Sequence, residues 1–251
     1  MQDSIEGKNV IVTGGAGGIG GGLIKGLARR GAKIAALYNR SEPEGELAKL
    51  ASWYKCDLTR KDSVKSTFDE IIKALGGLDA LVNVAGTWRG GSAEEVDDEQ
   101  IDFLIGANFK SVVYTNQAAF EAMKDKGGRI INFGSPEAME GSPGSPVYAS
   151  AKAAVQAWTR SAAQSWAGYG ITVNSVTPAM HTPPYERIRQ SLDEKGRAEL
   201  DASVAKRIPL GRLGDPEQDC APLIAFLISD GSRFMTGQIL PVDGGLRMLG
   251  A

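Results

Sequence analysis

Short β-rich apolar runs alternate with helix-length segments along the whole sequence. Several runs are apolar on consecutive residues, the pattern of parallel strands that are covered on both faces. We expect strands at Asn9–Thr13, Lys33–Tyr38, Trp53–Cys56, Asp79–Val84, Arg129–Phe133, Ile171–Val176 and Gln238–Val242. We expect helices at Lys61–Leu75, Asp97–Lys124, Val147–Trp166 and Pro216–Ile228. This alternation predicts an α/β fold, a doubly wound parallel sheet with helices on both faces.

Neither an internal repeat nor a charge block divides the chain, so we expect residues 1–251 to form a single domain. The stretch 179–213 has no clear period and is too long for a simple connector, which is typical of a substrate lid or a binding loop. Within it, the charged segment Glu186–Lys206 suits a lid that orders on binding, or equally a static flap.

Composition argues against several classes of protein. The formal net charge is −2 without a long basic run, which is not typical of nucleic-acid or acidic-membrane binding. The longest strongly apolar stretch, Ala221–Ile228, is far shorter than a membrane span. Two cysteines cannot build a disulfide framework, and a single histidine argues against a histidine-based metal site. The N-terminal residues are polar and acidic, unlike a signal peptide, so we expect a cytoplasmic protein without a bound metal.

A glycine-rich turn follows the first expected strand and opens a helical pattern. It reads Thr13-Gly14-Gly15-Ala16-Gly17-Gly18-Ile19-Gly20. Glycines let the backbone approach a pyrophosphate closely, and the helix N-terminus offers free N–H groups and a partial positive charge. The position of the turn therefore favours nucleotide binding over a merely flexible connection.

The end of the second strand carries no carboxylate. In dinucleotide-binding folds an acidic residue at this place binds the ribose 2′-hydroxyl, whereas here the sequence reads Asn39-Arg40-Ser41. Arg40 and Ser41 suit a 2′-phosphate, because a guanidinium matches phosphate geometry. Alternatively, Arg40 is an exposed loop cation. We expect NADP(H) in preference to NAD(H).

Tyr148 and Lys152 are four residues apart in an expected helix, which places them on one helix face. A free tyrosine has a pKa of about 10 and transfers protons poorly near neutral pH. A neighbouring ammonium group and an oxidised nicotinamide both favour the tyrosinate, and together they could lower that pKa. One exposed lysine could not supply the shift, so we expect the site to be partly buried. Such a spacing alone is frequent on helices, and its meaning depends on the other residues of the site.

Further motifs join this pair in a fixed order. They are Thr13-Gly14-x-x-x-Gly18-Ile19-Gly20, Asn83-Val84-Ala85-Gly86, Asn108, Ser135, Tyr148-x-x-x-Lys152, Asn174, Pro178 and Val242-Asp243-Gly244-Gly245. Together they resemble the short-chain dehydrogenase/reductase family over essentially the whole chain. The resemblance implies a Rossmann-like sheet of seven parallel strands and hydride transfer between NAD(P) and a hydroxyl or carbonyl carbon.

The resemblance also implies roles for individual residues. Tyr148 would be the general acid/base, and Lys152 would hold the nicotinamide ribose and tune the tyrosine. Ser135 would hydrogen-bond the substrate oxygen, and Asn108 would anchor a water-mediated proton relay or, alternatively, be a polar residue on a helix face. The residues expected to bind the cofactor are Gly14, Gly18, Ile19, Gly20, Asn39, Arg40, Ser41, Asp57, Leu58, Asn83, Ala85, Gly86, Tyr148, Lys152, Pro178, His181 and Thr182.

Some of these positions have a second reading or depart from the family pattern. Asp57 resembles an adenine-contacting acid and Asn83 a residue that organises the site, but either could cap a turn. Gly17 stands where many NADP-dependent relatives carry a basic residue, which counts against NADP. Ala179 replaces an expected glycine, and Thr182 comes one residue early, which puts its contact with the nicotinamide amide in doubt.

The expected substrate pocket lies at the carboxyl ends of the strands. Its expected residues are Trp88, Arg89, Glu137, Met139, His181 and Tyr185. The polar members indicate a polar or hydroxylated small-molecule alcohol or ketone, unless they simply face water.

Two classes of function remain open at this point. The first is an NAD(P)-dependent alcohol dehydrogenase or ketone reductase. The second is a catalytically silent dinucleotide-binding sensor or scaffold, which would have no use for a complete set of proton-transfer residues. The resemblance further implies a homotetramer, because the helices Asp97–Lys124 and Val147–Trp166 carry apolar stripes beyond what one sheet face requires. Ordinary core packing is the alternative.

Overall fold

The computed structural model describes residues 3–248, apart from the side chain of Pro184. Within this range, seven parallel strands form one sheet in the order β3-β2-β1-β4-β5-β6-β7. The strands are β1 (Asn9–Thr13), β2 (Lys33–Tyr38), β3 (Ser52–Lys55), β4 (Ala80–Asn83), β5 (Gly128–Phe133), β6 (Ile171–Pro178) and β7 (Ile239–Val242). The predicted doubly wound parallel sheet is confirmed, and strand ends differ from the expected ones by one or two residues.

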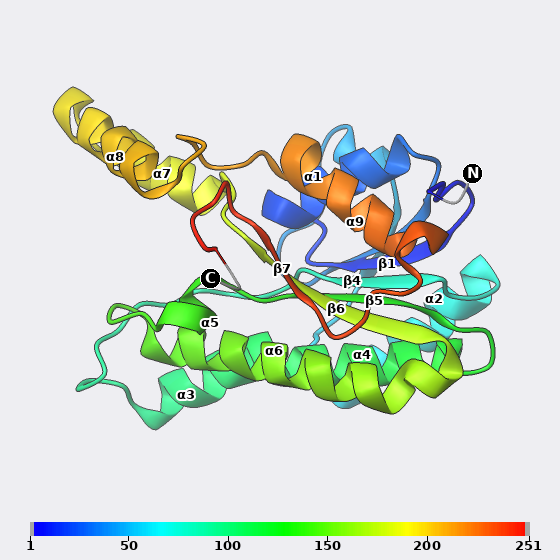
Figure 1. Cartoon of the computed structure of the whole chain (residues 1–251). Helices are drawn as coiled ribbons and strands as arrows, with labels where there is room; N and C mark the ends of the chain where they lie inside the picture. Colours follow the sequence, from blue (N-terminus) through cyan, green and yellow to red (C-terminus); the bar gives the residue numbers. More distant parts are fainter. Residues whose placement is uncertain (1–2, 249–251) are drawn as a thin grey trace.

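Helices cover both faces of this sheet (Figure 1). One face carries α1 (Gly18–Ala28) and α9 (Ala221–Ile228), and the other carries α2 (Lys61–Leu75), α4 (Ser111–Met123) and α6 (Pro146–Trp166). Side chains of a strand alternate between the faces, so Val10 and Val12 pack with Leu23, whereas Ile11 packs with Phe68. The two cores explain why the strands are apolar on consecutive residues.

Two expected helices are interrupted by π-helical turns. The segment predicted as one helix, Asp97–Lys124, consists of α3 (Asp98–Ile105), a π turn at Gly106–Lys110, and α4. The Asn108 amide Nδ2 donates to the Leu104 carbonyl at 3.0 Å, and the Ser111 N–H donates to the Gly106 carbonyl, five residues back. A side chain that occupies a main-chain acceptor in this way widens the turn. A second π turn, Pro216–Cys220, precedes α9.

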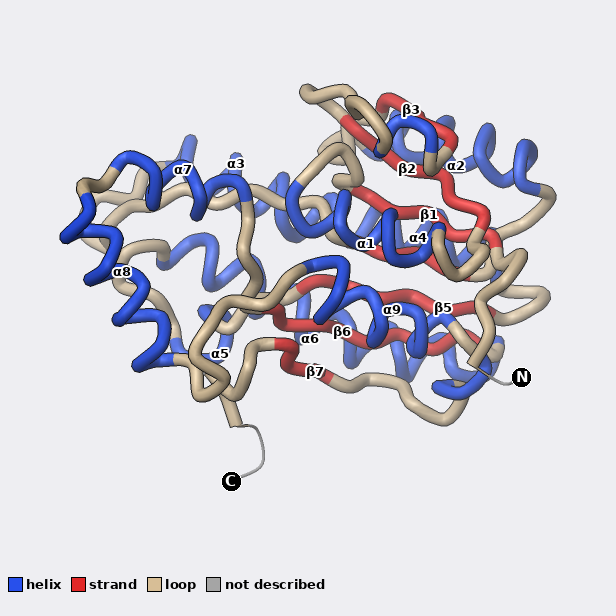
Figure 2. Tube along the Cα trace, turned by 90° about the horizontal axis from the view of Figure 1, so that it is seen from above, coloured by secondary structure: helices blue, strands red, loops and turns tan. Residues whose placement is uncertain are grey.

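The stretch 179–213, which the sequence marks as irregular, contains two helices. These are α7 (Pro183–Ser191) and α8 (Glu194–Arg207), which extend beyond the sheet at one end of the molecule (Figure 2). Arg189 joins them, because its Nε and Nη2 donate to the two carboxylate oxygens of Asp201 at 3.0 and 2.9 Å. The α8 helix buries none of its side chains. The role of the stretch 179–213 as a lid stays a prediction.

The sheet order places a topological switch point between β1 and β4. From β1 the chain first runs outward through β2 and β3, then returns to β4 on the other side. Ligands bind in open α/β sheets outside the carboxyl ends of the strands at such a point. No helix within residues 3–248 is both long and apolar enough to cross a membrane.

Candidate active site

The glycine-rich turn leaves β1 and enters α1 at the switch point. Gly14 has a φ of +65°, and a Cβ there would lie 2.9 Å from the Ala85 Cα in the loop after β4. A Cβ on Gly20 would overlap the Gly14 carbonyl group. Gly17 precedes α1 without a side-chain cap and has no neighbouring atom within 4 Å of a Cβ position. The turn is therefore tightly packed on its inner side and open at the helix N-terminus.

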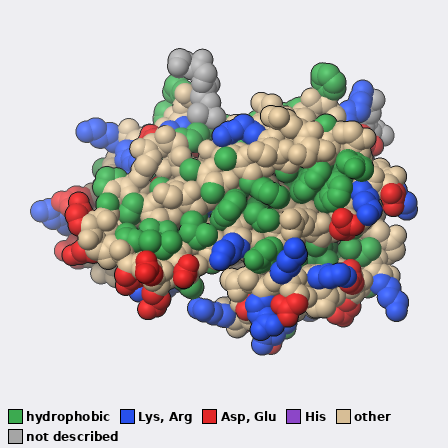
Figure 3. Space-filling model, turned by 90° about the horizontal axis from the view of Figure 1, so that it is seen from below, with side chains coloured by type: hydrophobic (Ala, Val, Ile, Leu, Met, Phe, Trp, Pro, Cys, Tyr) green, Lys and Arg blue, Asp and Glu red, His purple; other side chains and the backbone are tan. Residues whose placement is uncertain are grey.

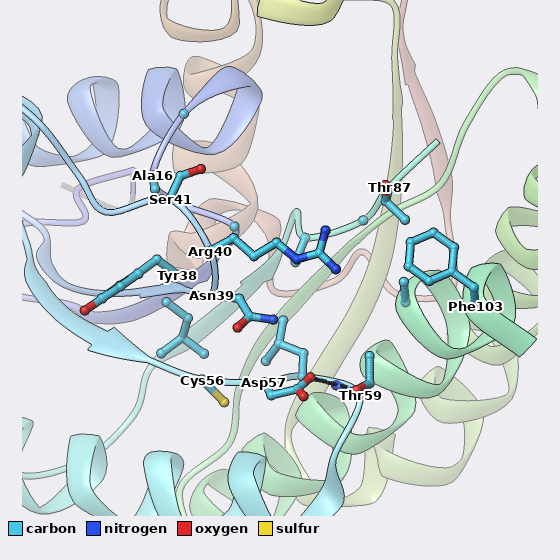
Figure 4. A pocket seen from close by; sticks show the side chains of 17 residues that line it. Ala16, Tyr38, Asn39, Arg40, Ser41, Cys56, Asp57, Thr59, Thr87 and Phe103 are labelled. Atoms are coloured by element: carbon cyan, nitrogen blue, oxygen red, sulfur yellow. Dashed lines mark hydrogen bonds between the residues drawn. The ribbon is translucent and has the colours of Figure 1, made fainter. Parts of the chain in front are cut away.

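A cavity of about 470 Å³ opens at this turn. Of the residues expected to bind the cofactor, those that line it are Gly14, Asn39, Arg40, Ser41, Asp57, Leu58, Ala85 and Gly86. Figure 4 shows the guanidinium of Arg40 extending into this cavity, with Asn39 and Asp57 on the adjacent wall. The Asp57 carboxylate accepts from the N–H and the hydroxyl of Thr59 at 3.0 and 2.7 Å, which fixes its orientation.

The loop after β4 meets the π turn at Asn108. The Thr87 N–H donates to Asn108 Oδ1 at 3.0 Å, and Asn108 Nδ2 donates back to the Thr87 carbonyl at 2.9 Å. A Cβ on Gly86 would lie 2.7 Å from Asn108 Oδ1 and 3.3 Å from Lys152 Nζ. The buried Asn108 amide thus holds the loop against the wall of the cavity, and only a glycine fits between it and the lysine.

Lys152 and Tyr148 lie on α6, beneath the end of β5. The buried Lys152 ammonium donates to the Phe133 carbonyl at 2.9 Å and lies 5.9 Å from the centre of the Tyr148 ring. Ser135 follows β5, its hydroxyl accepts the Glu137 N–H at 3.2 Å, and it lies close enough to Tyr148 to lower the pKa of the phenol. The structure therefore brings the predicted tyrosine, lysine and serine together.

Burial shifts the pKa values of two residues of this group. Burial raises the pKa of Tyr148 to about 12, an effect that the nearby Ser135 hydroxyl opposes and the charge of Glu137 reinforces. Burial also lowers the pKa of Lys152 to about 8. Burial is the largest influence on both groups, and the lowering of the tyrosine pKa by Lys152 together with an oxidised nicotinamide stays a prediction.

A second cavity, of about 640 Å³, contains Ser135 and Tyr148 in its wall. Of the residues expected to contact the substrate, Glu137 and Tyr185 line it. His181 lies half-exposed beside α7, where its Nε2 is 3.0 Å from the Glu186 carboxylate. Trp88 and Arg89 are exposed, and neither they nor Met139 line this cavity.

The remaining residues expected to bind the cofactor lie outside the lining of the first cavity. Gly18, Ile19 and Gly20 form the first turn of α1, Asn83 is buried in the sheet, and Pro178 lines the second cavity. Thr182 precedes α7 as its N-terminal flanking residue. The Asn83 amide donates to the Thr115 hydroxyl at 2.7 Å, so this side chain supports the sheet below the site.

Several lining residues were not predicted from the sequence. In the first cavity they are Ala16, Gly17, Leu37, Tyr38, Cys56, Thr59, Phe103 and Ala107, while Thr87 was expected in the wall of the substrate pocket. In the second they include Glu140, Ser142, Leu246 and Arg247, whereas Leu200, Ser203 and Arg207 belong to the stretch 179–213 that the sequence marks as a lid or binding loop. Most of the first set adjoin predicted residues in sequence, and Arg247 follows the end of β7. Phe103 carries no local signal, because only the packing of its helix brings it to the site.

The first cavity fits a dinucleotide. The inner glycines pack against backbone that leaves no room for side chains, while the outer part of the turn leaves the N-terminus of α1 open to an anion. Asn39, Arg40 and Ser41 follow β2 at the cavity rim, where the ribose of a nucleotide lies in this fold. Gly86 brings the other end of the cavity next to Lys152.

Known proteins are similar to this sequence over almost its full length. The family model described as enoyl-(acyl carrier protein) reductase matches residues 14–247. A 3-oxoacyl-[acyl-carrier-protein] reductase of Thermotoga maritima is 35% identical over 250 residues, 96% of this chain and 98% of the relative. An L-2,3-butanediol dehydrogenase of Corynebacterium glutamicum is 37% identical, with 95% and 98% covered. A 2-dehydro-3-deoxy-D-gluconate 5-dehydrogenase of Escherichia coli is 34% identical, with 96% of each covered.

Solved structures agree with these sequence matches. A dehydrogenase/reductase from Sinorhizobium meliloti 1021 superposes with a TM-score of 0.85 at 32% identity, covering 98% of each chain. A short-chain type dehydrogenase/reductase from Mycobacterium ulcerans gives a TM-score of 0.86 at 27% identity, covering 97% of this chain and 90% of the other. The chain therefore belongs to the short-chain dehydrogenase/reductase family and is an NAD(P)-dependent oxidoreductase.

Proposed function

We propose that this enzyme interconverts a small polar ketone and the corresponding secondary alcohol, with Tyr148 as the general acid/base. The observation that supports it most is the placement of Ser135 and Tyr148 together in the wall of a cavity of about 640 Å³. Lys152, on the same helix, lies against Gly86 in the wall of the nucleotide cavity. Proton transfer and nucleotide binding thus use adjacent residues.

Each side chain has a distinct task in the proposed reaction. When bound, the nicotinamide accepts the hydride from the alcohol carbon or supplies it to the carbonyl carbon. In reduction, Tyr148 donates its phenolic proton to the carbonyl oxygen, and Ser135 donates a hydrogen bond to the negative charge that develops there. In oxidation the same groups act in reverse. Lys152 would hold the nicotinamide ribose, and Asn108 fixes the loop that borders it.

The state of Tyr148 favours the reductive direction. With a pKa of about 12, the phenol keeps its proton at neutral pH and is ready to act as an acid. In the oxidative direction the phenol must first lose this proton, and Glu137, whose charge raises the pKa further, opposes that loss. At neutral pH the phenol is therefore in the protonated form that carbonyl reduction requires.

NADP(H) is the proposed cofactor. The guanidinium of Arg40 lies in the nucleotide cavity beside Ser41, and this pair suits a 2′-phosphate better than a free ribose hydroxyl (Figure 4). The absence of a basic side chain at Gly17 leaves this recognition to the residues after β2.

A polar, hydroxylated substrate is supported by two observations. The second cavity carries charged and hydroxyl side chains, among them Glu137, Glu140 and Ser142. Two relatives are named for small hydroxylated substrates, 2,3-butanediol and a deoxygluconate. The alternative of a silent sensor or scaffold would leave the complete set of Ser135, Tyr148 and Lys152 without a purpose.

A carbonyl screen tests the proposal. Purified protein is mixed with NADPH or NADH and a panel of hydroxyketones and diketones, and loss of the reduced-cofactor absorbance is followed. We expect turnover with NADPH, and a loss of about 10²–10⁴-fold in kcat for Tyr148→Phe. The variant should still bind NADPH in a fluorescence titration, since it lacks only a hydroxyl group. Retained turnover by Tyr148→Phe contradicts the assigned role, and a protein that binds NADPH without turnover of any carbonyl is a sensor.

A further inference from the structure

Arg247 lines the second cavity and is anchored there by its own backbone. The segment after β7 turns at Asp243, whose carboxylate is buried. Its Oδ1 accepts the Gly245 N–H at 3.0 Å, and its Oδ2 accepts the Arg247 N–H at 2.9 Å. These two bonds fix the main chain at Arg247, so the arginine is presented to the cavity from a firmly held wall.

The guanidinium of Arg247 is incompletely paired. Its side chain is 16% exposed, and its Nη1 donates to the Leu246 carbonyl while Nη2 pairs with Glu140. Its Nε is buried and has no hydrogen-bond partner within residues 3–248. Buried donors are nearly always satisfied in folded proteins, so an unpaired Nε next to the Nη2 that holds Glu140 marks an edge of the guanidinium that lacks a second acceptor oxygen.

The side chain of Glu140 is more exposed than that of Arg247, its partner. It is the last residue of α5 (Glu137–Glu140), its side chain is 48% exposed, and the next residue, Gly141, has a φ of +76°. A pair with one solvent-exposed member contributes little to stability. A ligand carboxylate that bonds to both Nε and Nη2 would make the stronger, two-point contact, and Glu140 can turn to solvent.

Charges in the cavity are arranged so that they discriminate between positions of a ligand anion. Glu137 follows Ser135 in the cavity wall and its charge acts on Tyr148, whereas Arg207 and Arg247 enter the wall from the end of α8 and from the segment after β7. Arg207 ends α8, lines the same cavity, and has no acidic partner within 4 Å in the described part of the chain. An anion next to the reacting carbonyl would therefore face Glu137, and an anion farther along the ligand would face the arginines.

We propose that the substrate carries a carboxylate remote from its reacting carbonyl, and that Arg247 binds this carboxylate side-on in place of Glu140. This inference rests on the proposed function and names the substrate class of that site. Arg207 adds a second, more exposed positive charge. Compounds with a carboxylate adjacent to the carbonyl are disfavoured by Glu137.

The test compares matched acids and esters. The probes are 5-oxohexanoate, its methyl ester and 2-oxohexanoate, with NADPH as reductant. For the unaltered enzyme we expect kcat/KM for 5-oxohexanoate to exceed that for the ester at least about tenfold, the effect of one charge-assisted pair. We expect 2-oxohexanoate to be a poor substrate. In Arg247→Gln the acid-to-ester ratio should fall to about one, because only the acid uses the guanidinium.

Three further variants separate recognition from folding. Arg247→Lys keeps the charge but loses the two-point contact, so part of the acid preference should remain. Glu140→Gln removes the competing carboxylate and should lower KM for the acid and raise the acid-to-ester ratio. Arg233→Gln, an exposed site before the start of β7 at the opposite end of the sheet, is the matched control and should change neither.

A binding measurement keeps this inference distinct from the proposed function. Hexanoate and methyl hexanoate, which have no reducible ketone, are titrated into the protein–NADP⁺ complex by calorimetry. Tighter binding of hexanoate, lost in Arg247→Gln, supports the carboxylate site even if no carbonyl is reduced. Equal binding of acid and ester, or an acid preference that Arg247→Gln retains, overturns the inference and leaves the proposed reaction standing.

Discussion

Lys152 combines full burial with a formal charge, so its ionisation is coupled to folding. It is 3% exposed, with its ammonium on the Phe133 carbonyl. Its pKa of about 8 in the folded chain is below its ordinary value of 10.5. The folded state therefore releases the proton first as pH rises, and the unfolded chain binds more protons between these two values.

The resulting prediction concerns stability as a function of pH. The free energy of unfolding should rise from pH 8 toward pH 10.5, by up to on the order of 3 kcal/mol, as the buried ammonium loses its charge. Lys152→Met removes this dependence and serves as the reference. Urea unfolding of both proteins at pH 7, 8.5 and 9.5 measures the difference, below the range in which Tyr148 titrates. Parallel curves for the two proteins would show that the ammonium is not desolvated.

For single residues, the sequence predicts which side chains form the site better than it predicts how buried those side chains are. The spacing of Tyr148 and Lys152, and their order after Ser135, are visible in the letters. The pKa of Tyr148 is not, because it depends on how many atoms of β5 and the loop after it exclude water from the phenol. The place of Arg247 in the cavity wall is likewise not visible in the letters, because it depends on how the segment from Asp243 to Arg247 folds.

Among the elements, the glycine turn is the part whose sequence most fully determines its geometry. A Cβ on Gly20 would overlap the Gly14 carbonyl, and a Cβ on Gly14 would press on Ala85. The first change would displace the glycine turn from the start of α1, and the second would force β1 and the loop after β4 apart at the switch point. Neither neighbour is a flexible side-chain tip, so the backbone itself must move.

Gly20→Ala should therefore weaken cofactor binding, with a Kd for NADPH at least about tenfold higher and a loss of stability of about 1–3 kcal/mol. Fluorescence titration and thermal unfolding measure the two effects. Gly168→Ala is the matched control, since Gly168 has no atom within 4 Å of a Cβ position and no positive φ. Unchanged NADPH affinity in Gly20→Ala would mean that the turn does not contact the cofactor.

The π turn at Asn108 is a feature that the apolar periodicity of the sequence does not predict. The apolar spacing in 97–124 continues through the turn and predicts one helix. The side chain of Asn108 instead takes the Leu104 carbonyl and both backbone groups of Thr87, a loop residue 21 positions away. A long-range contact of this kind leaves no trace in local propensity.

At the scale of the whole molecule, the side of the protein formed by α4 and α6 carries apolar side chains that are partly exposed to solvent. Figure 3 views this side, opposite to α1 and α9, and shows apolar side chains gathered along its middle with charged side chains around them. The rings of Phe120 and Trp166 stack at 5.0 Å, and Trp158 meets Trp166 edge-on at 6.1 Å, all of them partly exposed. We propose that this surface, formed by α4 and α6, joins subunits of a homotetramer.

Ala157→Glu tests this assembly without disturbing the subunit. Ala157 is exposed on α6 next to Trp158, and glutamate is nearly as good a helix former as alanine, so the isolated chain should tolerate the change. In an assembly through α6 the new carboxylate would be buried without a partner, which is strongly unfavourable. Light scattering should give four times 26.5 kDa for the unaltered protein and a smaller assembly for the variant. Ala198→Glu, exposed on α8, should leave the mass unchanged, and a mass near 26.5 kDa for the unaltered protein would rule out the tetramer.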